Sequence, residues 1–158
     1  LRNRLPVVTL RVFTPYGRYE EPGRLISDIM ISLIKGRTLK LSSPKAKRDF
    51  IYIDDVINAL LRVAKTPKTE GEIFNIGTGR GYHVEEVANL AQKVTGVELK
   101  ISWNNKKQYE FDKIGKSGFA NIEKAKRILQ WSPTYSIKQG LSQTYDWYKE
   151  NIRLYTSS

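Results

Sequence analysis

The sequence predicts an α/β fold that contains at least part of a parallel sheet, and three observations support this class. Short apolar segments of strand length alternate along the chain with longer segments in which apolar residues recur at helical spacing. Strands and helices that alternate in this way build parallel sheets. The 158 residues include no Cys, which excludes a disulfide scaffold and thiolate metal sites. A chain of this length buries enough apolar surface to fold without such cross-links.

The first strand is predicted over residues 5–13, where LPVVTLRVF shows the continuous apolar pattern of a strand buried on both faces of a sheet. Residues 14–17, TPYG, have the composition of a turn. Residues 25–34 carry apolar side chains at helical spacing. Lys35 and Gly36 then supply a cationic last turn and a C-terminal glycine, so this helix is expected to end there.

A short strand over 39–41 and a polar, basic loop over 42–47 precede another strand over 50–53. Asp54 or Asp55 is placed to cap the next helix, because a side-chain oxygen there accepts the free N–H groups of the first turn. The apolar face of that helix, which we expect to be buried, consists of Val56, Ile57, Leu60, Leu61 and Ala64.

The rest of the chain continues the alternation. Further strands and helices are expected, in chain order, at residues 72–76, 84–94, 99–103, 122–129 and 137–154. Trp131, Trp147 and Tyr148 are expected to pack under the last two helices. Residues 104–118 are polar without a clear period and are expected to be irregular.

Positive charge is concentrated in the first third of the chain. Residues 1–48 hold 11 Lys and Arg against three Asp and Glu, whereas residues 49–158 hold 16 against 13. Such a field attracts nucleic acid, acidic lipid or phosphorylated small molecules, or it only keeps the surface soluble. The basic residues are scattered among strand and helix patterns, with no Arg-rich run, zinc-ligand spacing or RNA-binding aromatic motif, which argues against nucleic acid.

Membrane and secretory functions have little support, and a cytoplasmic protein is expected. No apolar run approaches the roughly 20 residues that span a bilayer, and no signal-like apolar segment opens the sequence. The chain begins at Leu1 and its only Met is Met30, so we expect these residues to be part of a longer protein.

Gly77, Gly79 and Gly81 stand between a predicted strand and a predicted helix, as in a phosphate-binding turn. A dinucleotide fingerprint places its third glycine three residues after the second, whereas the interval here is two. No acidic residue ends a strand about 20 residues later, as that fingerprint requires. We therefore interpret the segment as a structural turn.

Arg48 ends the basic loop directly before a strand, where a guanidinium is held rigidly and can grip phosphate oxygens. The alternative is a salt bridge to Asp49, Asp54 or Asp55, and the residues alone leave both open. Asp54 and Asp55 also suggest a carboxylate pair or metal ligands, but a helix cap explains them more simply. His83, the one imidazole, is more typical of a surface helix start than of a general base.

Several segments, taken in order, carry a resemblance to a known family. They are LPVVTLRVFTPYGRYEEPGRLI, KGRTLKL, RDFIYIDDVINALL, EIFNIGTG, NIEKAKRILQWSP and IKQGLSQTYDWYKENI. From about Leu5 to Ile152 the chain resembles the C-terminal half of the extended short-chain dehydrogenase/reductases, the nucleotide-sugar epimerases and dehydratases. The most specific part is RDFIYIDDV followed by FNIGTG, in that order.

The resemblance implies a Rossmann-like fold of which this chain supplies the last parallel strands and a small mixed α/β substrate-binding domain. It implies a nucleoside diphosphate-sugar as substrate and a homodimer of the whole protein. It also implies NAD or NADP as cofactor, bound mainly by an N-terminal portion that these residues do not include. By the same resemblance, Arg24 would lie near phosphate or base and Leu25 against the base, while Leu39 and Leu41 would flank the nucleobase.

The resemblance further implies that Arg48 clasps the diphosphate and that Asn75 hydrogen-bonds there. The sequence also departs from the family. Thr14 stands where the family usually has an Asn that contacts the diphosphate, so a smaller hydroxyl replaces the amide. Other departures are Arg18 for a common Pro, Ser42-Ser43 for a Gly-containing turn, and Asn121 for a typical Asp in a stretch from Tyr109 that lacks the usual acidic and Arg pattern.

The family's chemistry requires a Gly-rich turn for the NAD(P) pyrophosphate and a Tyr-x-x-x-Lys pair whose Tyr moves the proton. Neither occurs here in a matching context, so the chain alone is expected to lack hydride-transfer activity. Two alternatives follow: a non-catalytic module that kept the nucleotide-sugar pocket, and a basic nucleic-acid-binding domain, which a steep salt dependence of DNA affinity would indicate.

Overall fold

The computed structural model describes residues 6–104 and 118–155. The helices are α1 (Leu25–Lys35), α2 (Ile53–Lys65), α3 (Val84–Thr95), α5 (Glu123–Leu129) and α6 (Ile137–Asn151), followed by the 3-10 helix η1 (Ile152–Tyr155). The strands are β1 (Thr9–Val12), β2 (Thr14–Tyr16), β3 (Leu39–Leu41), β4 (Lys47–Arg48), β5 (Phe50–Tyr52), β6 (Ile73–Ile76), β7 (Tyr82–His83) and β8 (Ile101–Trp103). The α/β class with parallel pairing is therefore confirmed.

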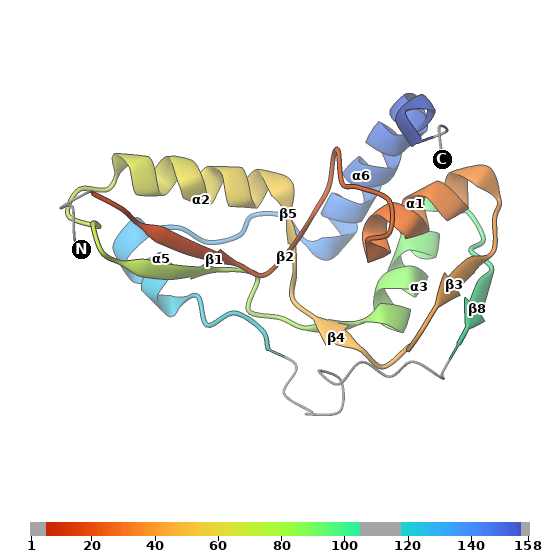
Figure 1. Cartoon of the computed structure of the whole chain (residues 1–158), viewed down its shortest axis with the longest axis horizontal. Helices are drawn as coiled ribbons and strands as arrows, with labels where there is room; N and C mark the ends of the chain where they lie inside the picture. Colours follow the sequence, from red (N-terminus) through yellow and green to blue (C-terminus); the bar gives the residue numbers. More distant parts are fainter. Residues whose placement is uncertain (1–5, 105–117, 156–158) are drawn as a thin grey trace.

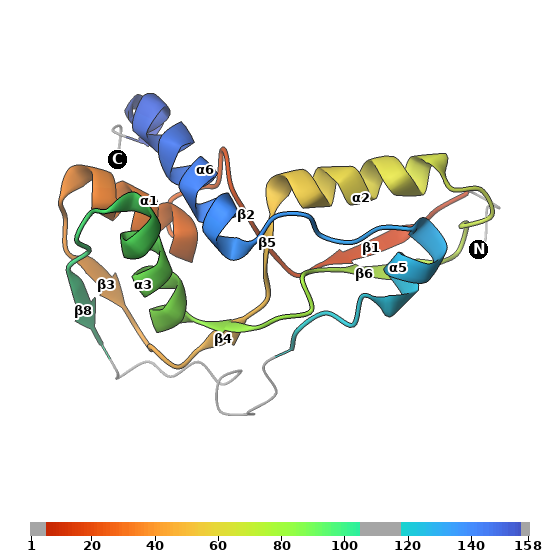
Figure 2. The same cartoon turned by 180° about the vertical axis from the view of Figure 1, so that it is seen from behind.

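Two lobes meet along β2 and β5 (Figure 1). The sheet lobe consists of the parallel pair β1–β6 with α2 and α5, and α5 lies in front of the pair when the molecule is seen from behind (Figure 2). The helical lobe packs α1, α3 and α6 together and carries the parallel pair β3–β8 at its edge. A short antiparallel pair, β4–β7, leads into α3.

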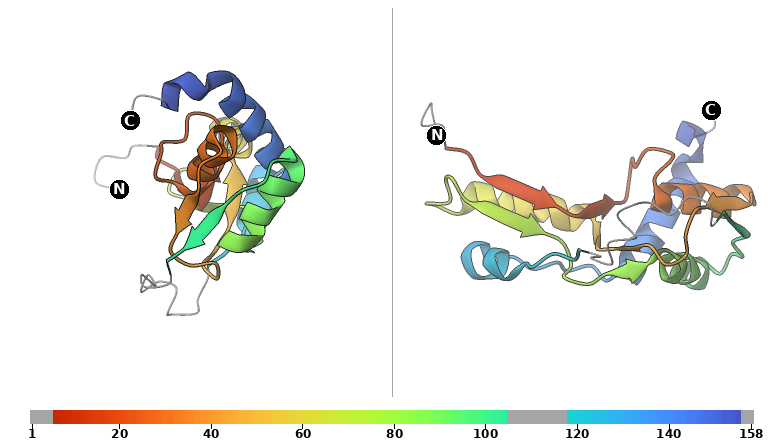
Figure 3. Two further views of the ribbon diagram at one scale, coloured as in Figure 1. Left: turned by 90° about the vertical axis from the view of Figure 1, so that its right-hand side faces the viewer. Right: turned by 60° about the horizontal axis from the view of Figure 1, so that its bottom comes forward.

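The first extended segment changes partner in its middle, and Figure 3 shows β1 and β2 as one continuous run. Thr9–Val12 pairs with β6, and Thr14–Tyr16 pairs with β5. At the change, the N–H of Phe13 donates to the Ile76 carbonyl oxygen (2.9 Å) and that of Thr14 to the Asp49 carbonyl oxygen (3.0 Å). The predicted turn at 14–17 is therefore wrong, because main-chain pairing with a distant strand overrides the turn composition.

The prediction that this first strand is buried on both faces is also wrong. Leu10 and Val12 face the core with Phe74 and Ile76, whereas Thr9, Arg11 and Ile73 are exposed on the other face of the pair. An apolar run is typical of parallel strands, which are normally covered on both faces. Within the described residues, helices cover one face only.

Strand β5 separates two apolar cores. Successive side chains of a strand point to opposite sides, so Phe50 and Tyr52 enter the helical lobe while Ile51 enters the sheet lobe. All three side chains are buried. The FIY sequence is apolar throughout because both of its sides face a core.

The predicted cap of α2 is wrong, since neither Asp54 nor Asp55 occupies the cap position, which is held by Tyr52. Asp55 is 1% exposed and its carboxylate accepts hydrogen bonds from the N–H (2.8 Å) and Oγ1–H (2.8 Å) of Thr134 and from the N–H of Tyr135 (3.1 Å). Asp54 forms an ion pair with Arg18 (2.5 Å). Among the residues that the structure describes, no cation forms a salt bridge to Asp55, and its buried carboxylate is stable because the hydroxyl and backbone N–H groups satisfy it.

The predicted buried face of α2 is largely wrong as well. Val56 is buried, but Ile57, Leu60 and Leu61 are 44%, 53% and 55% exposed. The helix instead turns Asp55, Val56 and Ala59 inward. The helix therefore carries two apolar stripes, and only one of them is covered by described residues.

The remaining elements agree with the sequence prediction within a few residues. Gly36 and Gly96 end α1 and α3 in the left-handed region, at φ 63° and 69°, as the C-terminal glycines predicted. Ser136 caps α6 and accepts a hydrogen bond from the Gln139 N–H. Strands β4 and β7 were not predicted, because two residues carry no periodic signal. Among the described residues, no helix is long and apolar enough to cross a membrane.

Candidate functional site

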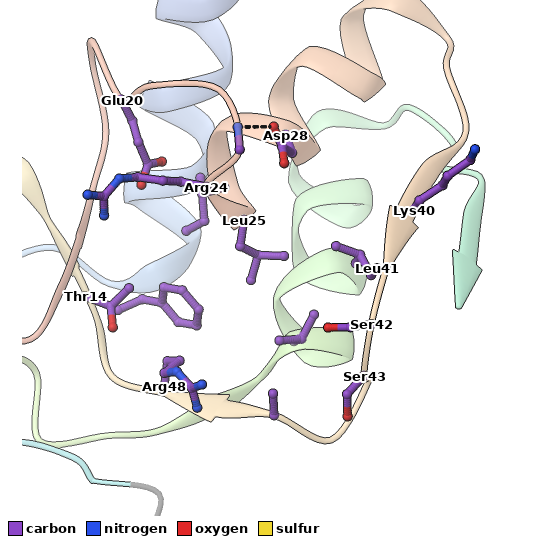
Figure 4. Close-up of a pocket in the computed structure, with 15 residues that line it drawn as sticks. Thr14, Glu20, Arg24, Leu25, Asp28, Lys40, Leu41, Ser42, Ser43 and Arg48 are labelled. Carbon is purple, nitrogen blue, oxygen red and sulfur yellow. Dashed lines mark hydrogen bonds between the residues drawn. The ribbon is translucent and has the colours of Figure 1, made fainter. Parts of the chain in front are cut away.

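A cavity of about 450 Å³ opens between the start of α1, strand β3 with the loop that follows it, and strands β2, β4 and β5 (Figure 4). We call it the α1–β3 pocket. Its lining residues are Thr14, Glu20, Gly23, Arg24, Leu25, Ile26, Asp28, Lys40, Leu41, Ser42, Ser43, Ala46, Arg48, Phe50 and Val84.

The pocket has two distinct walls in Figure 4. Thr14, Glu20 and Arg24 stand on the side nearest the sheet lobe. Leu41, Ser42 and Ser43 stand on the opposite side, with Leu25 between the walls and Arg48 below. The lining combines apolar side chains with polar and charged groups, two of them guanidinium groups, as the lining of a small-molecule site does.

The structure brings five of the seven residues that the sequence singled out into this one pocket. They are Thr14, Arg24, Leu25, Leu41 and Arg48. Thr14 opens β2, Arg24 immediately precedes α1, and Arg48 lies in β4, so residues from distant parts of the chain converge. Their role in binding a ligand stays a prediction.

Leu39 and Asn75 do not line the pocket. Leu39 is buried in the helical-lobe core, whereas Leu41, two residues further along β3, is only partly buried. Asn75 lies on β6 in the sheet lobe, where its Nδ2–H donates to the carbonyl oxygen of Asn121 (3.2 Å). Leu39 and Asn75 are thus not brought together with the other five residues, and their roles in binding stay predictions.

The segment between β2 and α1 is held by Glu20. The Ser27 N–H donates to Glu20 Oε2 (3.1 Å) and the Ser27 hydroxyl to the Glu20 carbonyl oxygen (3.3 Å). The Tyr148 hydroxyl, on α6, donates to the same carbonyl oxygen (2.7 Å). The Asp28 carboxylate accepts a hydrogen bond from the Gly23 N–H (2.8 Å), drawn as a dashed line in Figure 4. These bonds set the position from which Arg24 enters the pocket.

Glu20 has an unusual protonation equilibrium for a carboxyl group. Burial raises its pKa from 4.5 to about 7, although the Ser27 N–H and the charge of Arg24 act in the opposite direction. Burial therefore favours the protonated, uncharged form of this carboxyl group relative to an exposed glutamate. No cation forms a salt bridge to it among the described residues.

The opposite wall is attached to the start of α3. The N–H of Val84 donates to the Ala46 carbonyl oxygen (2.9 Å), and His83 Nδ1 lies 2.8 Å from the Lys45 carbonyl oxygen. His83 is thus a surface residue at a helix start, as predicted. Arg48, in the adjoining strand, donates from Nη1 to the Lys47 carbonyl oxygen (2.7 Å).

The Gly77–Gly81 turn is structural, as predicted, because a carboxylate of the chain fills it. Asp49, 1% exposed, accepts hydrogen bonds from the N–H of Thr78 (2.8 Å), Gly79 (2.9 Å) and Ala120 (2.9 Å) and from the Thr78 hydroxyl (2.5 Å). A nest of N–H groups binds one anion. Since Asp49 already occupies it, this turn does not fit the pyrophosphate of a dinucleotide.

The described residues contain no catalytic constellation in the pocket. The spacing Tyr-x-x-x-Lys occurs at Tyr145 and Lys149 on α6, but neither residue lines the cavity. The same spacing at Tyr109 and Lys113 lies outside the described residues, as does most of the stretch that departs from the family pattern. No group of three or more His, Asp or Glu among the described residues can hold a metal ion.

Sequence reasoning missed the acidic side of the pocket. Glu20 and Asp28 line it, and together with Glu21 they are the only acids in the first 48 residues. That isolation within a basic region was the available signal. Lys40, Ser42 and Ser43 were also missed as lining residues, because loop geometry cannot be read from composition.

An α/β fold with parallel strands and a pocket beside the carboxyl end of β1, with Arg24 and Arg48 among its lining residues, is typical of proteins that bind nucleotides. The family model described as "NAD dependent epimerase/dehydratase family" matches residues 2–77. A UDP-glucuronate 4-epimerase from Thermodesulfobacterium geofontis is 31% identical over 156 residues, covering 97% of this chain and 46% of the relative. The dTDP-D-glucose 4,6-dehydratase of Homo sapiens is 31% identical over 153 residues, covering 94% and 43%.

A solved structure agrees with these relatives. The UDP-glucuronic acid 4-epimerase from Bacillus cereus, in complex with UDP-glucuronic acid and NAD, superposes with a TM-score of 0.81 at 28% identity and covers 93% of this chain and 46% of its own. The chain belongs to the NAD-dependent epimerase/dehydratase family, within the extended short-chain dehydrogenase/reductases. It spans about half the length of the relatives it matches.

Proposed function

We propose that the chain is the substrate-binding portion of an NAD(P)-dependent nucleotide-sugar epimerase, dehydratase or reductase. The α1–β3 pocket holds the nucleoside diphosphate-sugar and presents the hexose for hydride transfer. Residues 1–158 form the C-terminal, nucleotide-sugar-binding region, and the cofactor is bound mainly by a portion of the protein that this chain does not include. The observation that carries the proposal is the convergence of Arg24, Leu25, Leu41 and Arg48 on one cavity.

The pocket offers each part of such a ligand a suitable surface. A guanidinium forms charge-assisted, bidentate hydrogen bonds with phosphate oxygens, which suits Arg48 and Arg24 to the diphosphate. Leu25 and Leu41 supply apolar surface for the faces of a nucleobase, and Ser42 and Ser43 supply hydroxyl groups at its edge. Binding energy from these remote parts orients the sugar carbon for reaction.

The cofactor is assigned to the rest of the protein because the residues here do not fit its pyrophosphate. The one Gly-rich strand–turn–helix among the described residues is filled by Asp49. We therefore expect the chain alone, given NAD and UDP-glucose, to form no epimerised or dehydrated product. Related solved structures hold NAD, which makes NAD the expected cofactor of the whole protein.

Isothermal titration calorimetry of the chain with UDP-glucose and with dTDP-glucose tests the proposal. We expect saturable 1:1 binding of at least one of them. Arg48→Ala is expected to weaken it about tenfold or more, since a charge-assisted hydrogen bond contributes about 1.5–3 kcal/mol. Arg37→Ala removes the same charge from an exposed position outside the pocket and serves as the control. No binding, or equal loss in both variants, contradicts the proposal.

A further inference from the structure

One end of the pocket carries acidic groups in addition to an arginine. Glu20 and Arg24 stand on the wall that faces the sheet lobe, and Asp28 stands beyond Arg24 at the start of α1. Both Arg24 and Asp28 act electrostatically on Glu20, and with all three ionised this group of charges sums to −1. In Figure 4 the guanidinium of Arg48 lies below Thr14, at the opposite end of the pocket from Glu20 and Asp28. A second anionic group on the ligand, beyond the diphosphate, would therefore meet an unfavourable field.

The direction of the ligand follows from the sheet. In open α/β sheets the cofactor crevice lies outside the carboxyl ends of the parallel strands. Strand β1 ends at Val12, two residues before Thr14. The hexose must meet the cofactor, so we expect it to extend from the diphosphate, held by Arg48 and Arg24, toward Thr14 and Glu20, while the base lies toward Leu41 and Ser42.

We propose that Glu20 makes this pocket select nucleoside diphosphate-sugars with an uncharged hexose over those that carry a uronic acid carboxylate. The inference rests on the proposed function and names its substrate class. It separates this chain from the Bacillus cereus relative, whose structure holds UDP-glucuronic acid. Two carboxylates in one desolvated site repel each other, and at an effective dielectric constant of about 20 this costs more than 1 kcal/mol within about 10 Å.

The groups around Glu20 determine how the selection depends on pH. Arg24 attracts its negative charge, Asp28 repels it, and Tyr16 and Tyr148 face it as un-ionised phenols because burial raises the pKa of both hydroxyls. Burial raises the pKa of Glu20 itself to about 7. A uronate that enters the pocket favours protonated Glu20, so its binding takes up a proton. Selection against the uronate is therefore strong at pH 8 and weak at pH 6.

The test compares the dissociation constants of UDP-glucose and UDP-glucuronate for the chain at pH 8 and pH 6. The diphosphate is esterified on both sides in each ligand, so it does not titrate in this range. We expect UDP-glucuronate to bind about tenfold more weakly at pH 8 and nearly as well as UDP-glucose at pH 6. Glu20→Gln is expected to bring the ratio close to one at both pH values. Glu21→Gln, which removes the same charge from the adjacent exposed residue outside this pocket, keeps the wild-type ratio.

A second measurement does not depend on any variant. Titrating the wild-type chain at pH 7 in buffers of different ionisation enthalpy gives the number of protons taken up, which is expected to be larger for UDP-glucuronate than for UDP-glucose. If neither ligand binds, the proposed function fails and this inference fails with it. If both bind with a ratio near one at pH 8, or with equal proton uptake, the inference is overturned while the proposed function stands.

Discussion

The two lobes differ in how completely they are covered. In the helical lobe, α1 buries Ile26, Ile29 and Met30 against α3 and α6, and these side chains are at most 1% exposed. In the sheet lobe, Leu60 and Leu61 on α2 and Ile73 on β6 remain exposed. The helical lobe has a closed core and contains the pocket. For the sheet lobe, we expect these exposed apolar residues to pack against the cofactor-binding portion of the whole protein.

The largest contrast is expected from truncating one apolar side chain in each lobe. Ile29→Ala leaves a cavity in the closed core and is expected to lower the free energy of unfolding by about 3 kcal/mol. Leu60→Ala, on the exposed stripe of α2, is expected to change it by less than about 0.5 kcal/mol. Urea unfolding followed by tryptophan fluorescence measures both. Equal losses would show that the stripe is covered in solution.

Asp49→Asn tests the junction between the lobes. The amide replaces an oxygen that accepts N–H donors with an NH₂ group that cannot, and buried donors are left unsatisfied. We expect a loss of about 2 kcal/mol in the free energy of unfolding. Asp146→Asn makes the same chemical change on the exposed side of α6 and is expected to have no measurable effect. If Asp49→Asn is as stable as Asp146→Asn, the Asp49 carboxylate does not stabilise the junction between the lobes.

Gly140→Ala tests how tightly the helical lobe is packed. A Cβ at Gly140 would lie 2.0 Å from the Tyr16 hydroxyl oxygen, and the Tyr16 ring is fixed between Phe50 and Tyr52. Alanine normally stabilises a helix by about 1 kcal/mol relative to glycine, but overpacking outweighs this gain. We expect a net loss of about 2 kcal/mol by thermal or urea unfolding. Adding Tyr16→Phe removes the clashing hydroxyl and should restore part of the loss.

Glu20 links the stability of the helical lobe to pH. Its pKa in the folded chain, about 7, exceeds its ordinary value of 4.5, so the folded state binds the proton more tightly. Its contribution to stability is complete below about pH 4.5 and is lost as the pH rises through 7. After allowance for solvent screening we expect Glu20→Gln to be more stable than wild type by about 1 kcal/mol at pH 8, with little difference at pH 5. Glu21→Gln should show no such dependence.

The smallest effect on the free energy of unfolding is expected on the exposed apolar stripe of α2. Leu61→Lys places a charge on an exposed position and is expected to change the free energy of unfolding by less than about 0.5 kcal/mol. The same substitution should reduce concentration-dependent association in sedimentation velocity, because it interrupts an exposed apolar stripe. A large loss of stability would mean that Leu61 belongs to a covered core.

Sequence patterns predicted what local chemistry determines. The ends of α1 and α3 follow from Gly36 and Gly96, whose left-handed backbone is favoured by glycine at any helix end. The change of partner at Phe13 was not predictable, because it depends on β5 and β6, which are formed by residues 50–52 and 73–76. The role of Asp55 was not predictable either, because its hydrogen-bond donors come from residues 134 and 135, far along the chain. Its position at the start of a helix indicated only a cap.

In the pocket, too, some features were predictable from the sequence and others were not. The ordered segments, of which RDFIYIDDV followed by FNIGTG is the most specific part, indicated the family. The resemblance then singled out Arg24, in the segment after the YG turn, and Arg48, before Asp49. The position of Glu20 was not indicated, because the loop that carries it is shaped by bonds to Ser27 and Tyr148 rather than by its own composition.

The bond between the Tyr148 hydroxyl and the Glu20 carbonyl oxygen joins residues 128 positions apart. Synthesis on the ribosome runs from the N-terminus, so the pocket loop is complete long before the helix that anchors it has emerged. Contacts of such sequence separation form slowly and late. A nascent chain would therefore display the strands and both arginines of the pocket before α6 docks and fixes the loop between them.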